Sequence, residues 1–196
     1  MKRCHQSTVL KSGTCCQKST GRVKSGNQMI TRRWCRTDPN RFHIRQQKSD
    51  DCAVAATQMA YQTVTNYQLP RDESLHLLTK KGIYFCHRDL EGTNFLALPK
   101  FFRETLAISA RLTTSNNKTL IKNLDKYKCL LYFVHNKNHV LIIDTHEWNL
   151  TVKRRYLYIR DPQRRHAEIV DPTLDPRFKP DTRGKHRYIC ISANMA

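Results

Sequence analysis

Two apolar segments in the second half of the chain constrain its fold most strongly. Cys129–Val134 and His139–Asp144 consist almost entirely of aliphatic, aromatic and β-branched residues, and only a short polar loop separates them. Runs of this composition predict buried strands, and the short connection favours antiparallel neighbours. Two further strands are predicted over Val152–Arg160 and Tyr188–Ser192. This part of the chain therefore predicts an antiparallel sheet.

Helical patterns precede these strands. Cys52–Tyr61 is rich in alanine and lacks charged residues, so it predicts a buried helix. Ser49, Asp50 and Asp51 stand directly before it as N-cap candidates. Three more helices are predicted over Pro70–Lys80, Phe95–Thr105 and Asn117–Lys126. Most helices come before the strands, which is typical of an α+β fold.

The domain organisation follows from a change in composition near residue 45. Residues 1–45 are rich in Lys, Arg, Ser, Thr and Gly, contain Asp38 as their only acid and show no apolar periodicity. Such a segment predicts a flexible basic arm, and residues 46–196 then form one folded domain. Within this domain, Gly92–Asn94 indicates a turn, and the proline-rich, charged segment Asp171–Lys185 indicates a surface loop.

Charge and cysteine content limit the partners and the compartment. The net charge of +19 and the pI near 9.9 favour acidic partners, such as nucleic acid, anionic membranes, polyanionic cell wall or acidic proteins. We expect no transmembrane segment and no secretory signal peptide, so the protein is expected in the cytoplasm or exported by a route that reads no signal peptide. The eight unevenly spaced cysteines are interpreted as reduced thiols, and no metal or organic cofactor is implied.

Cys52 is the candidate nucleophile. It lies in the first turn of the predicted buried helix, where backbone N–H groups and the helix dipole stabilise an anion such as a thiolate. Gln46, six residues earlier, could donate a hydrogen bond to an oxyanion together with the Cys52 backbone N–H, and Gln47 could take its place. The ordinary alternatives are a small buried hydrophobic residue for the cysteine and a surface side chain for the glutamine.

His139 and Asp161 are the candidate partners of this cysteine. His139 opens one predicted strand, and Asp161 ends the next. If these strands are antiparallel neighbours, the carboxylate lies beside the imidazole and can fix its tautomer and orientation. The alternatives are a histidine at a loop edge and an aspartate that starts a turn before proline. The other histidines considered, none of which begins an apolar run, are His135, His146 and His166.

At these residues the chain resembles the papain superfamily of cysteine peptidases. It is most similar to the double-glycine leader peptidases, the bacteriocin-processing domains of some peptide exporters, and to their stand-alone relatives. The resemblance covers roughly residues 42–165 and rests on these segments: Gln46–Ala56, Glu91–Asn94, Cys129–Val134, His139–Ile143 and Tyr158–Pro162.

The resemblance implies a papain-like fold, in which an N-terminal helix carries the nucleophile and packs on an antiparallel sheet. It implies Cys52 as nucleophile, His139 as base, Asp161 as the orienting carboxylate and Gln46 as the oxyanion residue. The family usually has glycine directly after the nucleophile, where this chain has Ala53.

The expected activity is hydrolysis of peptide bonds by a Cys-His-Asp triad with a glutamine at the oxyanion. The same groups could instead deamidate glutamine, transfer an acyl group or cleave wall-peptide amides. A different class of function is a basic nucleic-acid-binding protein without catalysis. For that class, Arg32, Arg33 and Arg36 could contact phosphates while Trp34 stacks on a base.

Overall fold

The computed structural model describes residues 43–48, 51–87, 90–134 and 138–193, with only the backbone described over 85–87 and 90–92. The helices are α1 (Cys52–Thr65), α2 (Arg71–Lys80), α3 (Leu98–Glu104), α4 (Asn117–Lys126) and the short 3₁₀ helix η3 (Pro176–Phe178). The strands are β1 (Tyr84–His87), β2 (Leu90–Thr93), β3 (Ile108–Ser115), β4 (Cys129–Phe133), β5 (Val140–Asn149), β6 (Arg154–Arg160), β7 (Glu168–Val170) and β8 (His186–Ala193).

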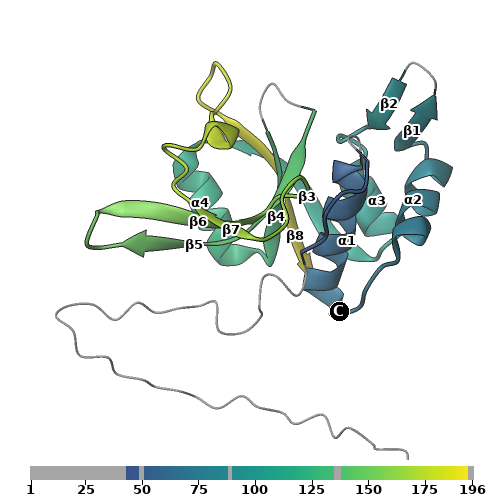
Figure 1. The fold of residues 1–196 in the computed structure, drawn as a ribbon, viewed down its shortest axis with the longest axis horizontal. Helices are drawn as coiled ribbons and strands as arrows, with labels where there is room; N and C mark the ends of the chain where they lie inside the picture. Colours follow the sequence, from purple (N-terminus) through teal and green to yellow (C-terminus); the bar gives the residue numbers. More distant parts are fainter. Residues whose placement is uncertain (1–42, 49–50, 88–89, 135–137, 194–196) are drawn as a thin grey trace, which may run out of the picture.

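An antiparallel sheet of six strands organises the molecule. Its strand order is β3-β8-β4-β5-β6-β7, and every neighbouring pair is antiparallel. A separate two-stranded hairpin, β1-β2, lies next to the helices that precede the sheet (Figure 1). The combination of helices with an antiparallel sheet confirms the α+β class predicted from the sequence.

The central strands are buried on both faces. Helices α1 to α3 lie on one side of the sheet and α4 on the other (Figure 1). In β4, Leu131 belongs to the core under α1, whereas its neighbour Leu130 belongs to the core under α4. Successive side chains of a strand point to opposite faces, so a strand that is covered on both faces must be apolar at nearly every position.

Several elements differ from the sequence-based expectations. Strands β1, β2, β3 and β7 were not predicted, α3 is shorter than the predicted helix, and Gly92 and Thr93 belong to β2 rather than to a turn. Of these, β3 and β7 lie at the edges of the six-stranded sheet, where one side of the strand has no neighbouring strand. Edge strands carry more polar residues than central ones. β3 has a mixed pattern of buried and exposed positions, and this weakens the sequence signal.

The predicted basic arm lies almost entirely outside the described residues, as do Ser49, Asp50 and His135. Within the ranges that the structure describes, none of the helices has the length and apolar character that crossing a membrane requires.

Arg160 connects α1 to the sheet, because its buried guanidinium contacts residues of both. Its guanidinium donates from Nε to one carboxylate oxygen of Asp144 at 2.8 Å and from Nη2 to the other at 2.6 Å. Nη2 also donates to the hydroxyl of Thr63 on α1 at 2.7 Å. Arg160 is only 2% exposed, so the guanidinium depends on these partners in place of water. The contact joins β5, β6 and α1 at one point.

Replacement of Arg160 by methionine is expected to destabilise the fold by about 3–5 kcal/mol, because it leaves the Asp144 carboxylate without its buried partner. Urea unfolding followed by circular dichroism measures the difference. Arg154→Met is the control, since Arg154 is exposed and pairs with Asp171 at the surface. The loss of unfolding free energy from Arg154→Met is expected to stay below about 1 kcal/mol. Equal losses from the two variants would contradict the proposed role of the buried pair.

Candidate active site

The start of α1 is held in place by ionic and polar contacts from later elements. Asp51 occupies the N-cap position, but its side chain makes no capping hydrogen bond. Its buried carboxylate instead accepts from Arg71 at the start of α2, at 2.5 Å, and from the Tyr84 hydroxyl at 3.4 Å. The Asp51 carbonyl accepts the first helical N–H, from Ala55. The first turn of α1 is therefore anchored to α2 and to the β1-β2 hairpin.

Cys52 is the first residue of α1 and is 2% exposed. Its thiol points to the loop before β5, where the Sγ atom lies 3.9 Å from the carbonyl oxygen of Asn138. Asn138 directly precedes His139. The sulfur therefore lies at the boundary between α1 and the entrance of β5.

His139 and Asp161 form a buried hydrogen-bonded pair. The imidazole Nε2 donates to Asp161 Oδ1 at 2.7 Å, and the two side chains are 5% and 2% exposed. The pairing of β5 with β6 is antiparallel, with Ile142 opposite Arg160, so the start of β5 lies beside the end of β6. The two strands are thus antiparallel neighbours, as expected, and their pairing brings the two side chains together.

Charge interactions bias the protonation of this pair. Burial alone would lower the pKa of His139, but the hydrogen bond with Asp161 and the interaction with the Cys52 side chain outweigh it and raise the pKa to about 9. The buried Nδ1 nonetheless has no hydrogen-bond partner of standard geometry among the described residues. Nδ1 is the ring nitrogen that remains once Nε2 is bound to Asp161.

Asp161 is held in its charged form from several sides. Burial favours the neutral acid, but hydrogen bonds from His139, from the Gln163 backbone N–H and from Arg177 lower the pKa of Asp161 well below its usual range. Arg177 Nη1 donates to Asp161 Oδ2 at 2.7 Å, which leaves Oδ1 available to the imidazole. The carboxylate is therefore fixed in both charge and orientation.

Arg177 is the residue of this site that sequence reasoning missed. It lies in η3, within the segment interpreted as a surface loop, and it also bonds Glu168 and Asp175. Asp175 caps η3 by accepting from the Arg177 backbone N–H, which is consistent with the turn role expected for an aspartate before proline. An arginine in a charged loop carries no local sequence signal for such a position.

Gln46 is near the pair but not in contact with the thiol. Its backbone N–H donates to the Pro162 carbonyl at 2.9 Å, which places the segment before α1 alongside Asp161. Its side-chain Nε2 donates to the Lys48 carbonyl at 2.7 Å. The structure thus brings Cys52, His139 and Asp161 to one place and leaves the Gln46 amide turned into its own loop. Gln47 is exposed.

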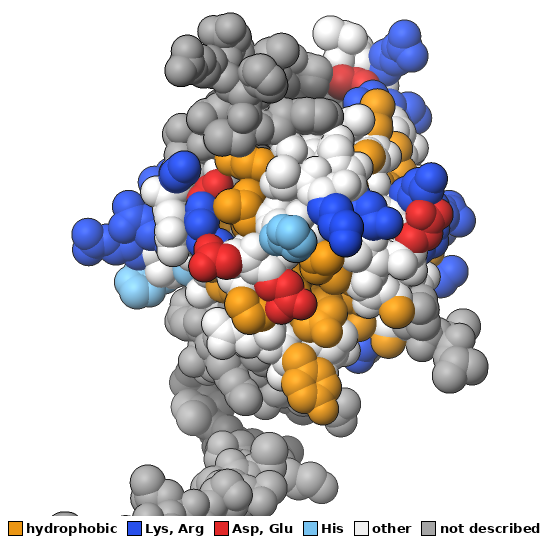
Figure 2. Space-filling view, turned by 90° about the vertical axis from the view of Figure 1, so that its right-hand side faces the viewer, with side chains coloured by type: hydrophobic (Ala, Val, Ile, Leu, Met, Phe, Trp, Pro, Cys, Tyr) orange, Lys and Arg blue, Asp and Glu red, His pale blue; other side chains and the backbone are white. Residues whose placement is uncertain are grey.

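Other expected or competing groups lie elsewhere. His146 contacts Asp125 and Arg155 on the far part of β5, and His166 is exposed. Within the described ranges, no group of three or more His, Cys, Asp or Glu side chains could hold a metal ion. On the face that carries α2 and the β1-β2 hairpin, Lys and Arg side chains occur in several separate groups, some with acidic neighbours (Figure 2).

Comparisons with known proteins do not assign this chain to a family. No protein-family model matches the chain, and no curated protein is significantly similar to it.

The raised pKa of His139 can be measured directly. We expect the ring protons of His139 to titrate near pH 9 in NMR spectra, and those of His186 below pH 6.5, because burial lowers the pKa of His186. Asp161→Asn should return the His139 pKa toward 6.5 or below, since the charged hydrogen-bond partner is gone.

The same shift predicts a pH dependence of stability. A pKa raised on folding stabilises the folded state fully below the unfolded value of 6.5, and this stabilisation is lost as the pH rises through about 9. The stability difference between the wild-type chain and His139→Gln should therefore shrink between these pH values. A difference that stays constant over this range would contradict the charged pair.

Proposed function

We propose that this protein is a cysteine peptidase of papain-like type, with Cys52 as nucleophile, His139 as general base and acid, and Asp161 as the orienting carboxylate. One observation carries the proposal: the buried thiol at the start of α1 contacts the residue directly before His139, and the buried imidazole of His139 is hydrogen-bonded to the carboxylate of Asp161. A thiol next to a base that is itself held by a third group is the arrangement of an activated nucleophile.

In the proposed reaction, the proton of Cys52 already resides on His139 Nδ1 near neutral pH, because the pKa of this imidazole is raised to about 9, and the thiolate attacks the carbonyl carbon of a peptide bond. The tetrahedral intermediate collapses as His139 donates that proton to the leaving amine, and a thioester to Cys52 remains. His139 then takes a proton from water, the hydroxide attacks the thioester, and the carboxylic acid product leaves with the free thiol restored. Asp161 stabilises the imidazolium at both stages.

The oxyanion would be held by the Cys52 backbone N–H, at the N-terminus of α1, and by the side chain of Gln46. For the second donor, the Gln46 amide would turn from the Lys48 carbonyl toward the thiol when substrate binds. Catalytic hydrogen bonds are often absent or long before the substrate arrives. The segment that carries Gln46 already lies against Pro162, so only a side-chain rotation is needed.

A cavity beside Asn138 is the proposed substrate cleft. It has a volume of about 480 Å³ and borders the loop whose carbonyl contacts the Cys52 thiol. Its wall combines apolar residues with charged ones, and these are Phe95, Leu96, Phe133, Val134, Lys179, Asp181, Lys185 and Arg187. Apolar walls with a few polar groups are typical of sites that bind a side chain and fix its orientation. Cys52, His139 and Asp161 do not line this cavity, so we expect it to hold an apolar residue of the peptide to one side of the cleaved bond.

The reactivity of Cys52 tests the proposal. At pH 5.5, iodoacetamide should modify Cys52 much faster than Cys129 or Cys190, since ordinary thiols with a pKa of ~8.5 are protonated there. Burial raises the pKa of Cys129 to about 12 and also raises that of Cys190, so these two thiols are expected to stay inert. Mass spectrometry of the digested protein measures the labelling of each cysteine.

His139→Ala should slow the labelling of Cys52 and leave the other thiols unchanged. In a screen of peptide substrates, Cys52→Ala should remove all cleavage, whereas Cys190→Ala, a matched change of a buried thiol, should leave it nearly intact. Equal, slow labelling of every cysteine together with no cleavage of any peptide would rule out the enzyme.

Arg177 acts in this proposal as a positioning residue. Arg177→Gln should lower kcat by about 10²-fold with little change in KM, because a misplaced Asp161 no longer aligns the imidazole. The alkaline limb of the pH–rate profile should also move, since the charge next to Asp161 is lost. Arg164→Gln, a change at an exposed neighbour, is the control and should leave both unaltered. Loss of folding stability without a shift of the pH profile would indicate a structural role only.

A further inference from the structure

A second cavity lies on the face of the sheet opposite α1. It has a volume of about 610 Å³, within the usual range of small-molecule sites. Its walls come from α4, β6, the segment 172–180 and the first residue of β8. Its buried lining residues Leu120, Leu157 and Phe178 belong to the core under α4, whereas Cys52 belongs to the core on the other face. The cavity is therefore on the other side of the sheet from Cys52, although Lys179 and His186 line both this cavity and the proposed substrate cleft.

The interior of this cavity is largely apolar. Its apolar lining residues are Leu120, Ile121, Leu157, Pro172, Leu174, Phe178 and Pro180. Leu174, at its edge, is 70% exposed. A hollow with this lining favours the apolar body of a ligand.

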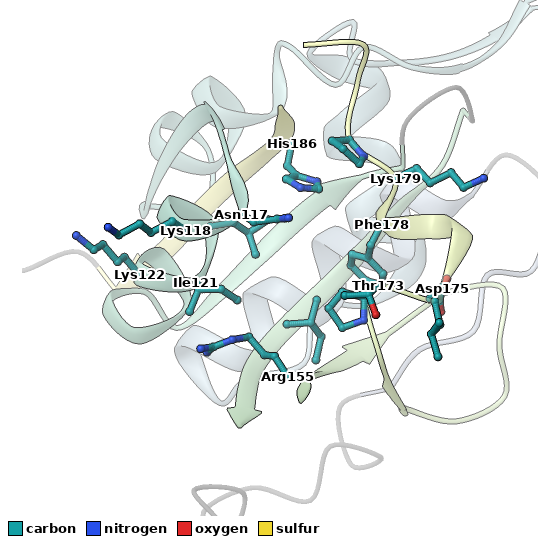
Figure 3. A pocket seen from close by; sticks show the side chains of 15 residues that line it. Asn117, Lys118, Ile121, Lys122, Arg155, Thr173, Asp175, Phe178, Lys179 and His186 are labelled. Carbon is teal, nitrogen blue, oxygen red and sulfur yellow. The ribbon is translucent and has the colours of Figure 1, made fainter. Parts of the chain in front are cut away.

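The rim of the cavity is cationic. Lys118 and Lys122 stand on the side of α4 and Lys179 on the opposite side (Figure 3). Within the described part of the chain, none of these three lysines has a carboxylate within ion-pair distance. The one acidic residue of the lining, Asp175, is already bound to Arg177. The rim therefore has positive charge that the protein itself does not neutralise.

The side chains of Lys118, Lys122 and Lys179 extend away from the hollow (Figure 3). Four rotatable carbons allow each ammonium group to turn over an anion bound at the mouth.

His186 contributes a polar group to the wall. It is 3% exposed, and its ring lies among the side chains that line the cavity (Figure 3). Nδ1 is hydrogen-bonded to the Tyr132 hydroxyl at 2.8 Å, whereas the buried Nε2 has no partner among the described residues. Burial raises the pKa of Tyr132, so the phenol keeps its proton and can donate it to Nδ1. In the tautomer in which the phenol donates to Nδ1, the proton of His186 is on Nε2, which then is a buried donor with no acceptor among the described residues.

We infer that this cavity binds a small anionic amphiphile, a molecule with an apolar or aromatic body and a carboxylate, phosphate or sulfonate head. The body fills the hollow between α4 and the segment 172–180, and the head lies at the lysine rim. An oxygen of the ligand accepts from His186 Nε2. A basic segment such as the N-terminal arm is a poor occupant, because the rim would repel it.

Two fluorescent dyes with one body test this site. 8-Anilinonaphthalene-1-sulfonate carries an anionic head, and N-phenyl-1-naphthylamine has the same rings without it. The full chain should bind the sulfonate about tenfold more tightly than the neutral dye, at the lower end of the enrichment that a positively charged cleft gives an anion. Raising the salt concentration should narrow this difference.

Matched variants locate the binding. Lys118→Glu/Lys122→Glu should weaken binding of the sulfonate about tenfold and leave the neutral dye unchanged. Lys80→Glu/Lys81→Glu makes the same charge change at two exposed residues, the last residue of α2 and its C-cap, and should not change the binding of either dye. Ile121→Trp, which fills the hollow, should abolish binding of both dyes. Thermal unfolding of each variant shows whether the fold is retained, and Lys118→Gln/Lys122→Gln replaces the first pair if it is not.

The proposal is wrong if the two dyes bind equally well, or if the α2 variants weaken the sulfonate as much as the α4 variants do. It is equally wrong if a folded Ile121→Trp protein binds both dyes as the wild-type chain does. None of these results depends on peptidase activity, so they leave the proposed function to its own tests.

Discussion

The antiparallel pairing of β5 with β6 is the constraint on which the rest of this structure depends. It sets Ile142 opposite Arg160, and so the entrance of one strand lies beside the exit of the other. Arg160 then reaches Asp144 and α1, while the next residue, Asp161, reaches His139. A change of register by one residue would turn both side chains to the wrong face. One backbone arrangement therefore positions the helix and the candidate site together.

The charged groups near this strand pair are buried but fully engaged. Asp161 accepts from His139, from Arg177 and from a backbone N–H, and Arg160 is paired with Asp144. Buried charges are costly without such partners. In the proposed enzyme the same contacts keep Asp161 ionised. The charged carboxylate stabilises the imidazolium form of His139, which carries the proton of the Cys52 thiol. The contacts that compensate for the burial of these charges therefore also orient the imidazole.

The segment 171–185 connects the two faces of the sheet. Arg177 binds the carboxylate of the candidate active site, and its partner Asp175 lines the cavity under α4. His186, which follows this segment, borders both that cavity and the proposed substrate cleft. A loop rich in proline and charged residues therefore contributes to both candidate sites. Its buried Phe178 packs on Tyr132.

The sequence by itself determined the central strands, the buried helix that starts at Cys52 and the order of the three candidate residues. These features are local, because a strand covered on both faces must be apolar and an uncharged, alanine-rich run favours a buried helix. The tertiary structure alone decided the contacts of Arg177, the pairing of Asp51 with Arg71, the orientation of the Gln46 amide and the edge strands β3 and β7. Each depends on residues distant in the chain, and no local periodicity records which polar side chains will meet.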